Sequence, residues 1–460
     1  MNLNILRPLI ELLPEVKEPN ITPKLKKRLI WTGVALTIFL VLGIVRPIGS
    51  AIAEQGEFLE SIQLITASQL GTLATLGIGP IVMASIILQL LIGADIINMD
   101  MSDPSQKSLF QGTQKLLAMV FCFFEAGVYV ISGFIPATGG GLSSAILILQ
   151  LAIGGIMIIY LDEVVSKYGI GSGVGLFIVA GVSSTIIWRI FSWATIPGTG
   201  EFIGLVPQIM RGTIIGNIPT EAIFPLIFTA VVFLIAVYVQ TMKVEIPLTS
   251  SRMRGRGTKY PLKFMYLSVI PVIFVAALFA NIQLWGIAMD RMGMPLLGEF
   301  QDNQPVSGVA YYLQAPHGAL GTPADIKATA QNPRVIFQIL FYTGGMIIGA
   351  IVFGKFWAKM SNMTSEDVAD QLKGIGLHVP GFRRDKRVIK RVLDRYIPPL
   401  IVISAAAVAI LAVLADLTGA VGTGTGILLL VGILYQIYES LASEEAFRDI
   451  PGIDPSKLPT

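Results

Sequence analysis

The sequence predicts an all-α membrane protein with ten transmembrane helices, and three observations support this fold class. Hydrophobic residues make up 53% of the 460 residues and charged residues only 14%, whereas a soluble domain is usually about a quarter charged. Ten apolar runs are long enough to cross ~30 Å of hydrocarbon as helices, which takes roughly twenty residues each. The runs are continuous, without the alternation typical of membrane β-barrels.

The ten predicted spans follow one another along almost the whole chain. They lie near residues 30–45, 74–92, 116–135, 142–161, 173–194, 222–239, 264–288, 335–358, 397–415 and 420–438. They divide as two halves of five, and an odd number of spans per half makes any internal repeat an inverted, pseudo-symmetric one. The second span of each half contains a proline, Pro80 or Pro271. Prolines weaken the backbone ladder of a span, so this matched pair points weakly to the functional axis.

The distribution of basic residues predicts that both termini are cytosolic. With the amino terminus inside, the cytosolic side receives 27 of the 33 lysines and arginines, as the positive-inside rule requires. The basic first thirty residues lack a cleavage site after a short apolar core, so we do not expect a cleaved signal peptide. The predicted parts are a cytosolic segment at 1–29, a first half at 30–195, an external connection at 196–220, a second half at 221–441 with cytosolic loops at 243–263 and 359–395, and a cytosolic tail at 442–460.

Catalytic or metal-binding clusters are not evident in the sequence. The only histidines, His317 and His378, fall on opposite sides of the membrane in this topology, and the single cysteine, Cys122, lies in an apolar run. Glycine-rich stretches at 168–175 and 422–426 lack the strand, turn and lysine of a phosphate-binding loop. They are better explained as close packing surfaces or flexible helix ends. We therefore expect neither an enzyme nor a cofactor.

A short amphipathic segment, EFLESIQLITAS at 57–68, lies between the first two spans. Its apolar residues Phe58, Leu59, Ile62 and Ile65 fall on one helical face. About eleven residues cover ~16 Å as a helix, roughly half of a membrane. Two interpretations remain open, namely an interfacial helix on the external surface and a segment that dips back into a cavity.

Polar residues occur at two places within the predicted spans. Glu125 is near the middle of the third span, a position that costs several kcal/mol unless the carboxylate faces a polar interior. A structural hydrogen bond between helices is the main alternative to a functional role. Asn281 and Gln283 lie in the seventh span. Neutral interhelical bonds are worth only about 0.6 kcal/mol each, so an interface built from them can open.

The two large cytosolic loops are more basic than orientation requires. Their tips carry six cations, Arg252, Arg254, Arg256, Lys259, Arg383 and Arg384. Arginine-rich loops punctuated by glycine suit phosphate backbones. The alternative is that these charges serve only orientation and contact with anionic lipid.

Several long stretches resemble the SecY family, the pore subunits of the Sec protein-conducting channel, in its archaeal variety. The matching stretches are ITASQLGTLATLGIGPIVMASIILQLLIG, FQGTQKLL, YLDEVVSKYGIGSGVGLFI, KVEIPL with GTKYPLKFMYLSVIPVIF, ALFANIQLWG, and RYIPPL with GTGTGILL. They occur in the family's order from about residue 20 to 440. The resemblance implies a clam-like fold of two halves with an hourglass pore, a short plug helix and a lateral gate to lipid.

The resemblance also assigns roles to individual residues. The pore ring would be Ile78, Val82, Val174, Ile178, Ile273 and Leu429. The plug would be about 57–67, with Phe58, Leu59, Ile62 and Ile65, and the lateral gate would include Met83, Glu125 and Asn281. Met83 stands where the family leads us to expect threonine, so the gate is less polar here. Independently of the resemblance, bulky aliphatic residues offer no hydrogen bonds to ions and favour a constriction that excludes water.

We expect a passive channel in the cell membrane that moves unfolded polypeptides outward and releases transmembrane segments sideways into lipid. The implied partners are SecE-type and beta-type small membrane subunits, a ribosome bound through loops 243–263 and 359–395, and a nascent or unfolded polypeptide with a signal sequence. The alternative function, an ion-coupled small-molecule transporter, would need a compact polar or charged site at the midplane. A scaffold without a pore would leave the glycine-rich constriction and the short helix unexplained.

Overall fold

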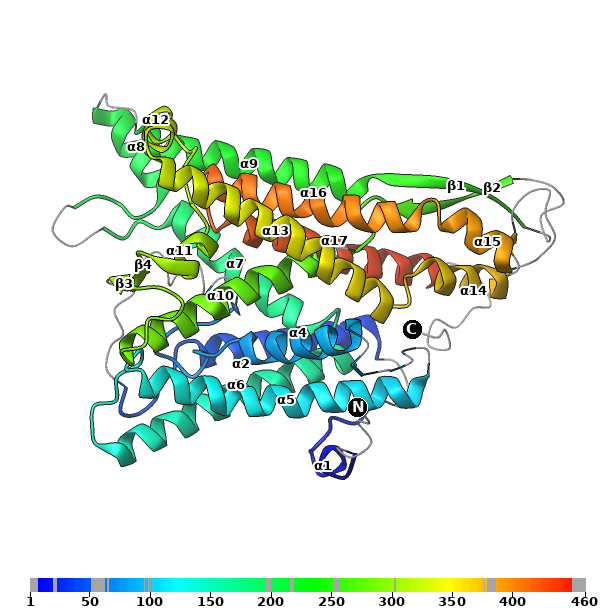
Figure 1. The fold of residues 1–460 in the computed structure, drawn as a ribbon, viewed down its shortest axis with the longest axis horizontal. Helices are drawn as coiled ribbons and strands as arrows, with labels where there is room; N and C mark the ends of the chain where they lie inside the picture. The colour runs from blue at the N-terminus through cyan, green and yellow to red at the C-terminus, as the bar shows by residue number, and fades with distance from the viewer. Residues whose placement is uncertain are drawn as a thin grey trace.

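The protein is a bundle of long helices with a small sheet projecting from one end (Figure 1). The computed structural model describes residues 7–19, 23–50, 63, 66–94, 96–97, 99, 101, 103–195, 200–215, 219–250, 257–267, 269–301, 303–375, 377–378 and 386–448. The helices are α1 (Arg7–Glu11), α2 (Leu25–Leu42), α4 (Gly79–Gly93), α5 (Pro104–Ile131), α6 (Gly141–Tyr168), α7 (Gly173–Phe191), α8 (Leu205–Ile215), α9 (Thr220–Thr241), α10 (Ile270–Arg291), α11 (Gly308–Leu313), α12 (Pro323–Gln331), α13 (Pro333–Met360), α14 (Ser365–Ile375), α15 (Lys386–Leu393), α16 (Ile397–Leu417) and α17 (Gly424–Arg448). The strands are β1 (Lys243–Ser250), β2 (Gly257–Lys263), β3 (Phe300–Gln301), β4 (Gln304–Pro305) and β5 (Leu377–His378).

The predicted all-α membrane fold is confirmed. Within the described residues, seven helices are long and apolar enough to cross a membrane, namely α5, α6, α7, α9, α10, α13 and α16. The helices α4 and α17 contain shorter apolar stretches, and α2 has three basic residues, Lys26, Lys27 and Arg28, in its first turn. These ten helices correspond in order to the ten predicted spans.

Two of the spans begin later than the hydropathy predicts, and the cause is proline. Pro80 and Pro271 lie in the first turns of α4 and α10, where the missing N–H is needed by no helical bond and the fixed φ favours helix initiation. The N-cap residues of these two helices, Ile78 and Val269, have nearly identical backbone angles, φ −89°, ψ −1° and φ −90°, ψ −3°. The prolines therefore start these helices, and the prediction that they weaken a continuous span is wrong.

The long helices form two groups that meet along α4, α7, α10 and α17. One group contains α2, α5 and α6, and the other contains α9, α13 and α16 (Figure 1). Contacts of α4 with α10 and α13, and of α7 with α17, join the groups. In the most apolar stretch of each span, 72% of the α10 residues but only 11% of the α9 residues are buried. The helix α10 is therefore central, and α9 faces outward.

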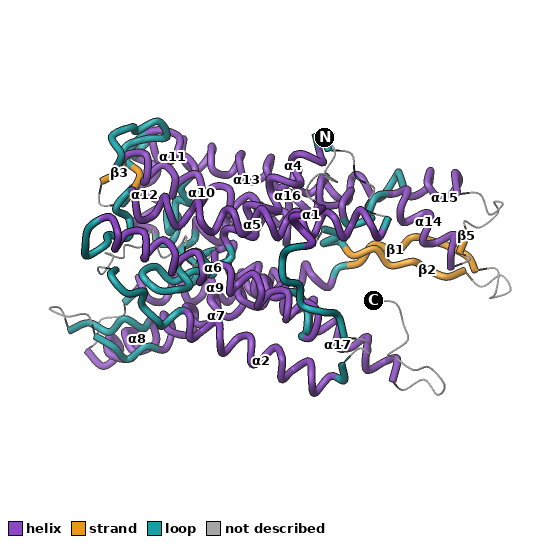
Figure 2. The backbone as a smooth tube through the Cα atoms, turned by 90° about the horizontal axis from the view of Figure 1, so that it is seen from below, coloured by secondary structure: helices purple, strands orange, loops and turns teal. Residues whose placement is uncertain are grey.

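The sheet unites the two loops that the sequence shows as separate basic segments. Its strand order is β2-β1-β5, and both pairings are antiparallel. Thr249 and Ser250 of β1 pair with His378 and Leu377 of β5. We call the end of the bundle that carries β1, β2, α14 and α15 the hairpin end, and the end that carries α8, α11 and α12 the opposite end (Figures 1 and 2).

Candidate functional site

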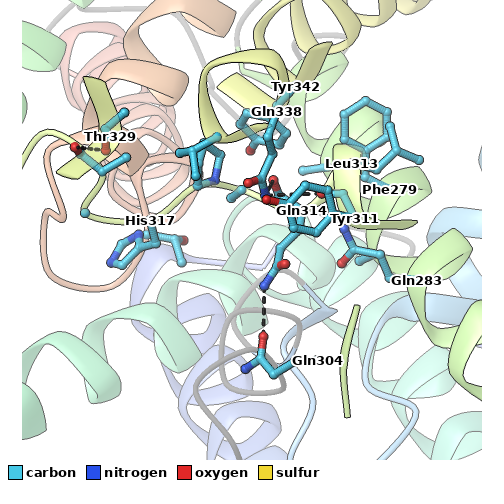
Figure 3. A pocket seen from close by; sticks show the side chains of 18 of the residues that line it. Phe279, Gln283, Gln304, Tyr311, Leu313, Gln314, His317, Thr329, Gln338 and Tyr342 are labelled. Carbon is cyan, nitrogen blue, oxygen red and sulfur yellow. Dashed lines mark hydrogen bonds between the residues drawn. The ribbon is translucent and has the colours of Figure 1, made fainter. Parts of the chain in front are cut away.

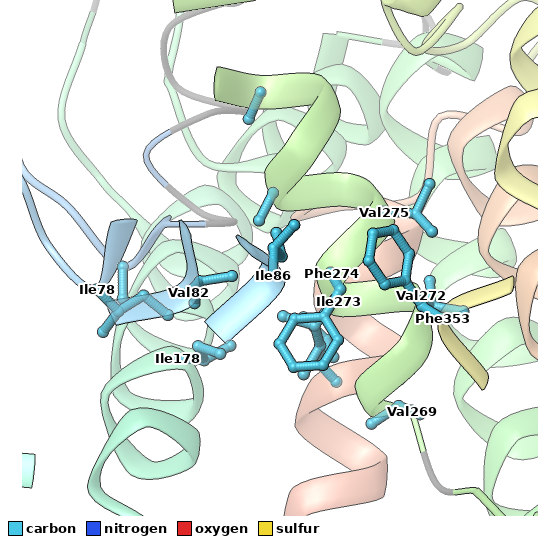
Figure 4. Close-up of a cluster of buried hydrophobic side chains, with 14 of the residues drawn as sticks. Ile78, Val82, Ile86, Ile178, Val269, Val272, Ile273, Phe274, Val275 and Phe353 are labelled. Carbon is cyan, nitrogen blue, oxygen red and sulfur yellow. The ribbon is translucent and has the colours of Figure 1, made fainter. Parts of the chain in front are cut away.

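The residues predicted to form a pore ring come from four places in the fold and belong to one buried apolar cluster. Ile78 caps α4, Val82 lies one turn inside that helix, Val174 and Ile178 lie on α7, Ile273 on α10 and Leu429 on α17. All six are buried except Val174, which is partly buried against the cluster. Ile78 and Val82, Ile178, and Ile273 project from their three helices in Figure 4. The structure thus supplies apolar side chains from both helix groups where the groups meet.

Ile86 is a member of this surface that the sequence interpretation missed. It is 1% exposed and follows Ile78 and Val82 at successive intervals of four residues, so the three side chains lie on one face of α4. Figure 4 shows Ile86 beyond Val82 and toward α10. The four-residue spacing is visible in the sequence, but the ring residues of this helix were assigned from a family motif that ends at Val82.

The chain just before α4 is anchored beside residues that are predicted to form the ring. The Ile78 N–H donates to the Thr66 carbonyl at 2.8 Å. Gly77 has φ +53°, and a Cβ there would lie 2.2 Å from the same carbonyl oxygen, so only glycine fits. A Cβ on Gly181 of α7 would lie 3.9 Å from the Ala67 Cα. Thr66 and Ala67 end the segment predicted as a plug, whereas Phe58, Leu59, Ile62 and Ile65 lie outside the described residues.

A continuous seam runs where α4 and α5 meet α10 and α13. Near the hairpin end, the ring of Phe356 of α13 packs directly against Gly93 of α4. A Cβ on Gly93 would lie 2.4 Å from that ring. In the middle, Phe124 and Trp285 pack edge to face with centroids 6.2 Å apart.

The seam ends in a polar contact at the opposite end of the bundle. Arg291, the last residue of α10, donates through Nη1 to the Gly133 carbonyl at 2.5 Å. Its guanidinium lies 5.7 Å from the Phe134 ring centroid.

The polar groups of the seam are buried without being well satisfied. Glu125 and Asn281 are each 1% exposed, and Met83 is 3% exposed. The Asn281 amide donates to Ala277 of its own helix at 2.8 Å. Among the described residues, Glu125 Oε1 and Trp285 Nε1 have no hydrogen-bond partner, so the structure does not support an interhelical bond for Glu125. Each unsatisfied buried group costs about 1–3 kcal/mol, which weakens the closed seam.

The glycine-rich stretch at 168–175 forms a capped helix start. Asp162 of α6 accepts a hydrogen bond from the Val174 N–H at 2.8 Å, and Ser172 Oγ accepts from the Gly175 N–H at 3.1 Å. A Cβ on Gly173 would lie 2.5 Å from the Asp162 Cα. The glycine therefore lets the two helices approach closely enough for the carboxylate to cap α7.

The second glycine-rich stretch, 422–426, is capped in the same way. Asp416 of α16 accepts from the Gly424 N–H at 2.6 Å, and Thr423 Oγ1 accepts from the Gly426 N–H at 3.2 Å. The Tyr342 hydroxyl of α13 also donates to Asp416, at 3.0 Å. The sequence interpretation named neither aspartate. The only signal was an aspartate several residues before the pattern Ser/Thr-Gly-x-Gly.

The basic tips are mostly beyond what the structure describes. Lys259 pairs with Pro247 in the β1–β2 ladder, whereas Arg252, Arg254, Arg256, Arg383 and Arg384 lie outside the described residues. Ion pairs hold the bases of the two loops. Lys263 at the base of the hairpin forms an ion pair with Glu439 of α17, and Lys390 of α15 pairs with Glu366 of α14 at 2.7 Å.

Comparison with known proteins identifies one family throughout. A family model described as SecY matches residues 72–438. The protein translocase subunit SecY of Methanococcus vannielii is 43% identical over 458 residues, covering 97% of this chain and 98% of that protein. A solved structure described as a protein conducting channel has a TM-score of 0.85 at 44% identity and covers 98% of this chain and 100% of its own. Sec61 in a canine ribosome-channel complex from the endoplasmic reticulum has a TM-score of 0.82 at 44% identity, with the same coverage.

Proposed function

This chain belongs to the SecY family and is a protein-conducting channel rather than a small-molecule transporter, and from this premise we propose how its residues conduct polypeptides. The observation that carries the proposal is the convergence of aliphatic residues from α4, α7, α10 and α17 at the junction of the two helix groups. Ile78, Val82, Val174, Ile178, Ile273 and Leu429, with Ile86, form a constriction that excludes hydrated ions yet deforms around a passing chain. Stripping water from an ion is costly, and aliphatic side chains offer no replacement ligands.

The segment at about 57–67 serves as a plug against this constriction. Its described end, Thr66 and Ala67, is buried between Gly77 and Gly181. Gly181 lies about one turn beyond Ile178 toward the opposite end of α7. The segment is thereby tethered to the side of the ring that we assign to the exterior.

The seam between α4 and α5 on one side and α10 and α13 on the other is the lateral gate. We assign to it the buried Glu125, whose Oε1 has no partner among the described residues, together with the buried Asn281 and Met83, and an apolar transmembrane segment that leaves through it would face lipid. The weakness of the polar contacts favours opening, while the aromatic contact of Phe124 with Trp285 favours closure.

The hairpin end is cytosolic, and the chain lies in the cell membrane with both termini inside. This orientation places the loops 243–263 and 359–395, joined by the β1–β5 pairing, where a ribosome can bind Arg252, Arg254, Arg256, Lys259, Arg383 and Arg384. The similarity to Sec61 in a ribosome complex supports this partner. SecE-type and beta-type subunits contact the outward faces of the bundle.

The chain is built from two inverted halves, 30–195 and 221–441, and acts without catalysis of its own. Three matched pairs support the inverted repeat, namely the α4 and α10 starts, the Asp162 and Asp416 caps, and the Ser172 and Thr423 caps.

Ion conductance of the purified channel in planar bilayers tests the ring. Replacement of Val82, Ile178 and Ile273 together by Ser should raise the resting conductance at least about fivefold, because hydroxyl groups keep a narrow passage wet. Replacement of three outward-facing α9 residues, Ile227, Val231 and Leu234, which are 49%, 44% and 66% exposed, is the matched control and should leave it unchanged. Ring variants as ion-tight as the parent would show that these residues are ordinary core packing.

A further inference from the structure

A cavity of about 470 Å³ opens on the opposite-end side of the constriction, within the size range of ligand-binding sites. Its walls continue the faces of the helices that bear the ring. On α10, Ala280 lies seven residues, about two turns, after Ile273, and on α7 Arg189 lies eleven residues, about three turns, after Ile178. The turn before α17 contributes Gly422 and Thr423, close to the start of the helix that bears Leu429. A chain that leaves the ring toward the opposite end therefore meets this cavity.

Side-chain amides line the cavity from four separate elements. They are Gln283 of α10, Gln304 of β4, Gln314 after α11 and Gln338 of α13. The Gln314 amide donates to Gln304 Oε1 at 3.1 Å, and Gln338 donates to the Tyr311 and Gln314 carbonyls at 3.1 and 3.2 Å. Figure 3 marks the bond between Gln314 and Gln304 with a dashed line. Three of the amides are thus fixed in position by the protein.

The fourth amide, Gln283, is held ready for a ligand. It is 5% exposed, and its carboxamide has no hydrogen-bond partner within the described part of the chain. Its amide atoms face the cavity rather than being sealed from solvent, so water can reach them. A ligand that offers both a donor and an acceptor at this position can replace that water.

The charged groups of the lining are already engaged. Asp325 accepts from the Thr322 hydroxyl at 2.6 Å in the capping box of α12, and Arg189 has an interaction within the protein. The neutral carboxamides of the lining offer N–H and C=O together, which is complementary to a peptide group.

We propose that this cavity is a binding site for the backbone of an extended, uncharged polypeptide segment, with Gln283 hydrogen-bonded to a peptide group of the bound chain. The site rests on the proposed path through the ring and adds to it a place where an emerging chain is held. Backbone hydrogen bonds are independent of sequence, so such a site retains any chain that the ring admits. Each bond is worth only about 0.5–1.5 kcal/mol, which is weak enough to let the chain advance.

Photolabelling of the full-length channel in nanodiscs by a short peptide tests the proposal. The probe is a capped peptide, acetyl-Gly-Ser-Gly-Ser-amide with a diazirine, and the matched probe has the same sequence with N-methylated peptide groups. We expect labelling within residues 276–342 by the first probe, reduced about fivefold by N-methylation and by Gln283→Met, the change that loss of one neutral hydrogen bond produces. Gln89→Met is the control variant, because Gln89 is 2% exposed, has an unpartnered Oε1 and does not line the cavity.

Equal labelling by both probes, or full labelling of Gln283→Met, would show that the cavity is a solvent-filled passage without a peptide site. Labelling that both Met variants reduce equally would overturn the proposal too, because a general change in the protein would then explain it. Labelling that appears only after residues 57–67 are deleted would assign the cavity to the plug instead. Ring conductance is measured separately with the cavity intact, so failure here leaves the proposed pore standing.

Discussion

The helices α7 and α17 begin at opposite ends of the bundle with the same device, an aspartate from the preceding helix and a Ser/Thr-Gly-x-Gly turn, yet the two starts differ in their surroundings. Asp162 at the hairpin end lines a cavity of about 300 Å³ together with Glu15, Glu163 and Lys167. Asp416 is 1% exposed and accepts from both Gly424 and Tyr342. The same aspartate cap therefore fixes the starts of α7 and α17 at the two ends of the bundle. We expect the stability that each cap contributes to depend on how deeply its aspartate is buried.

Close approach of the backbone is common to both starts and explains the glycines. A Cβ on Gly424 would lie 2.1 Å from the Ala412 carbonyl oxygen, just as one on Gly173 would lie 2.5 Å from the Asp162 Cα. Because backbone atoms cannot move aside cheaply, both positions exclude any side chain. Val174 and Leu429, the ring residues nearest these turns, are thereby held at fixed depth.

The largest effect is expected from removing the buried cap. Asp416→Ala leaves the Gly424 N–H and the Tyr342 hydroxyl without a partner, and each orphaned group costs about 1–3 kcal/mol, for a total of about 4 kcal/mol. Thermal unfolding of the purified channel in one detergent, followed by tryptophan fluorescence, measures the loss. Asp416→Asn keeps an acceptor for Gly424 and should recover at least half of it. Tyr342→Phe removes one of the two donors and should destabilise by less than half as much as Asp416→Ala.

A smaller effect is expected at the hairpin end. Asp162→Ala removes one acceptor from the start of α7, where water in the neighbouring cavity can replace it, so we expect a loss of about 1 kcal/mol, typical of an N-cap. The same unfolding measurement on Asp162→Ala and Asp416→Ala gives the ratio directly. Equal losses of stability in the two variants would refute the idea that burial determines how much each cap stabilises the protein.

These caps also show which features could not be predicted from the sequence. The ten spans could be predicted because hydrophobic length is a local property, and the resemblance could assign ring residues because its motifs are contiguous. The capping aspartates could not be found, because their bonds join residues twelve and eight positions apart across two packed helices, and glycines alone suggest flexibility. The pairing of β5 with β1 and the orphaned Gln283 depend on chain segments distant in sequence, which periodicity does not report.

The smallest effect is expected for the amino-terminal segment around Glu15 and Val16, which packs on α6 near Asp162. Lys167 Nζ bonds Glu15 at 2.8 Å and Glu163 at 3.1 Å, and the Val16 N–H donates to Glu163 Oε1 at 3.1 Å. The hydrogen bond and positive charge of Lys167 lower the pKa of Glu15 below its ordinary value of 4.5. A lowered carboxyl pKa stabilises the folded segment above that ordinary value, and this stabilisation disappears as the pH falls through the lower folded pKa.

Hydrogen exchange of the Val16 amide provides the readout, because that N–H reports whether the segment is docked. At neutral pH, Glu15→Gln should accelerate its exchange about twofold to threefold, as expected for an ion pair with one exposed member. The variant and parent should converge once the pH has fallen below the lowered pKa of Glu15 in the docked segment, because Glu15 is then protonated in both states of the segment. Glu11→Gln is the control, since the Arg7–Glu11 pair is exposed on both sides and 3.8 Å long, and it should change nothing. Faster exchange that persists unchanged at low pH would mean that Glu15 acts through packing rather than charge. The amino-terminal segment would then be held over Asp162 by apolar contacts such as that of Ile10 with Gly112.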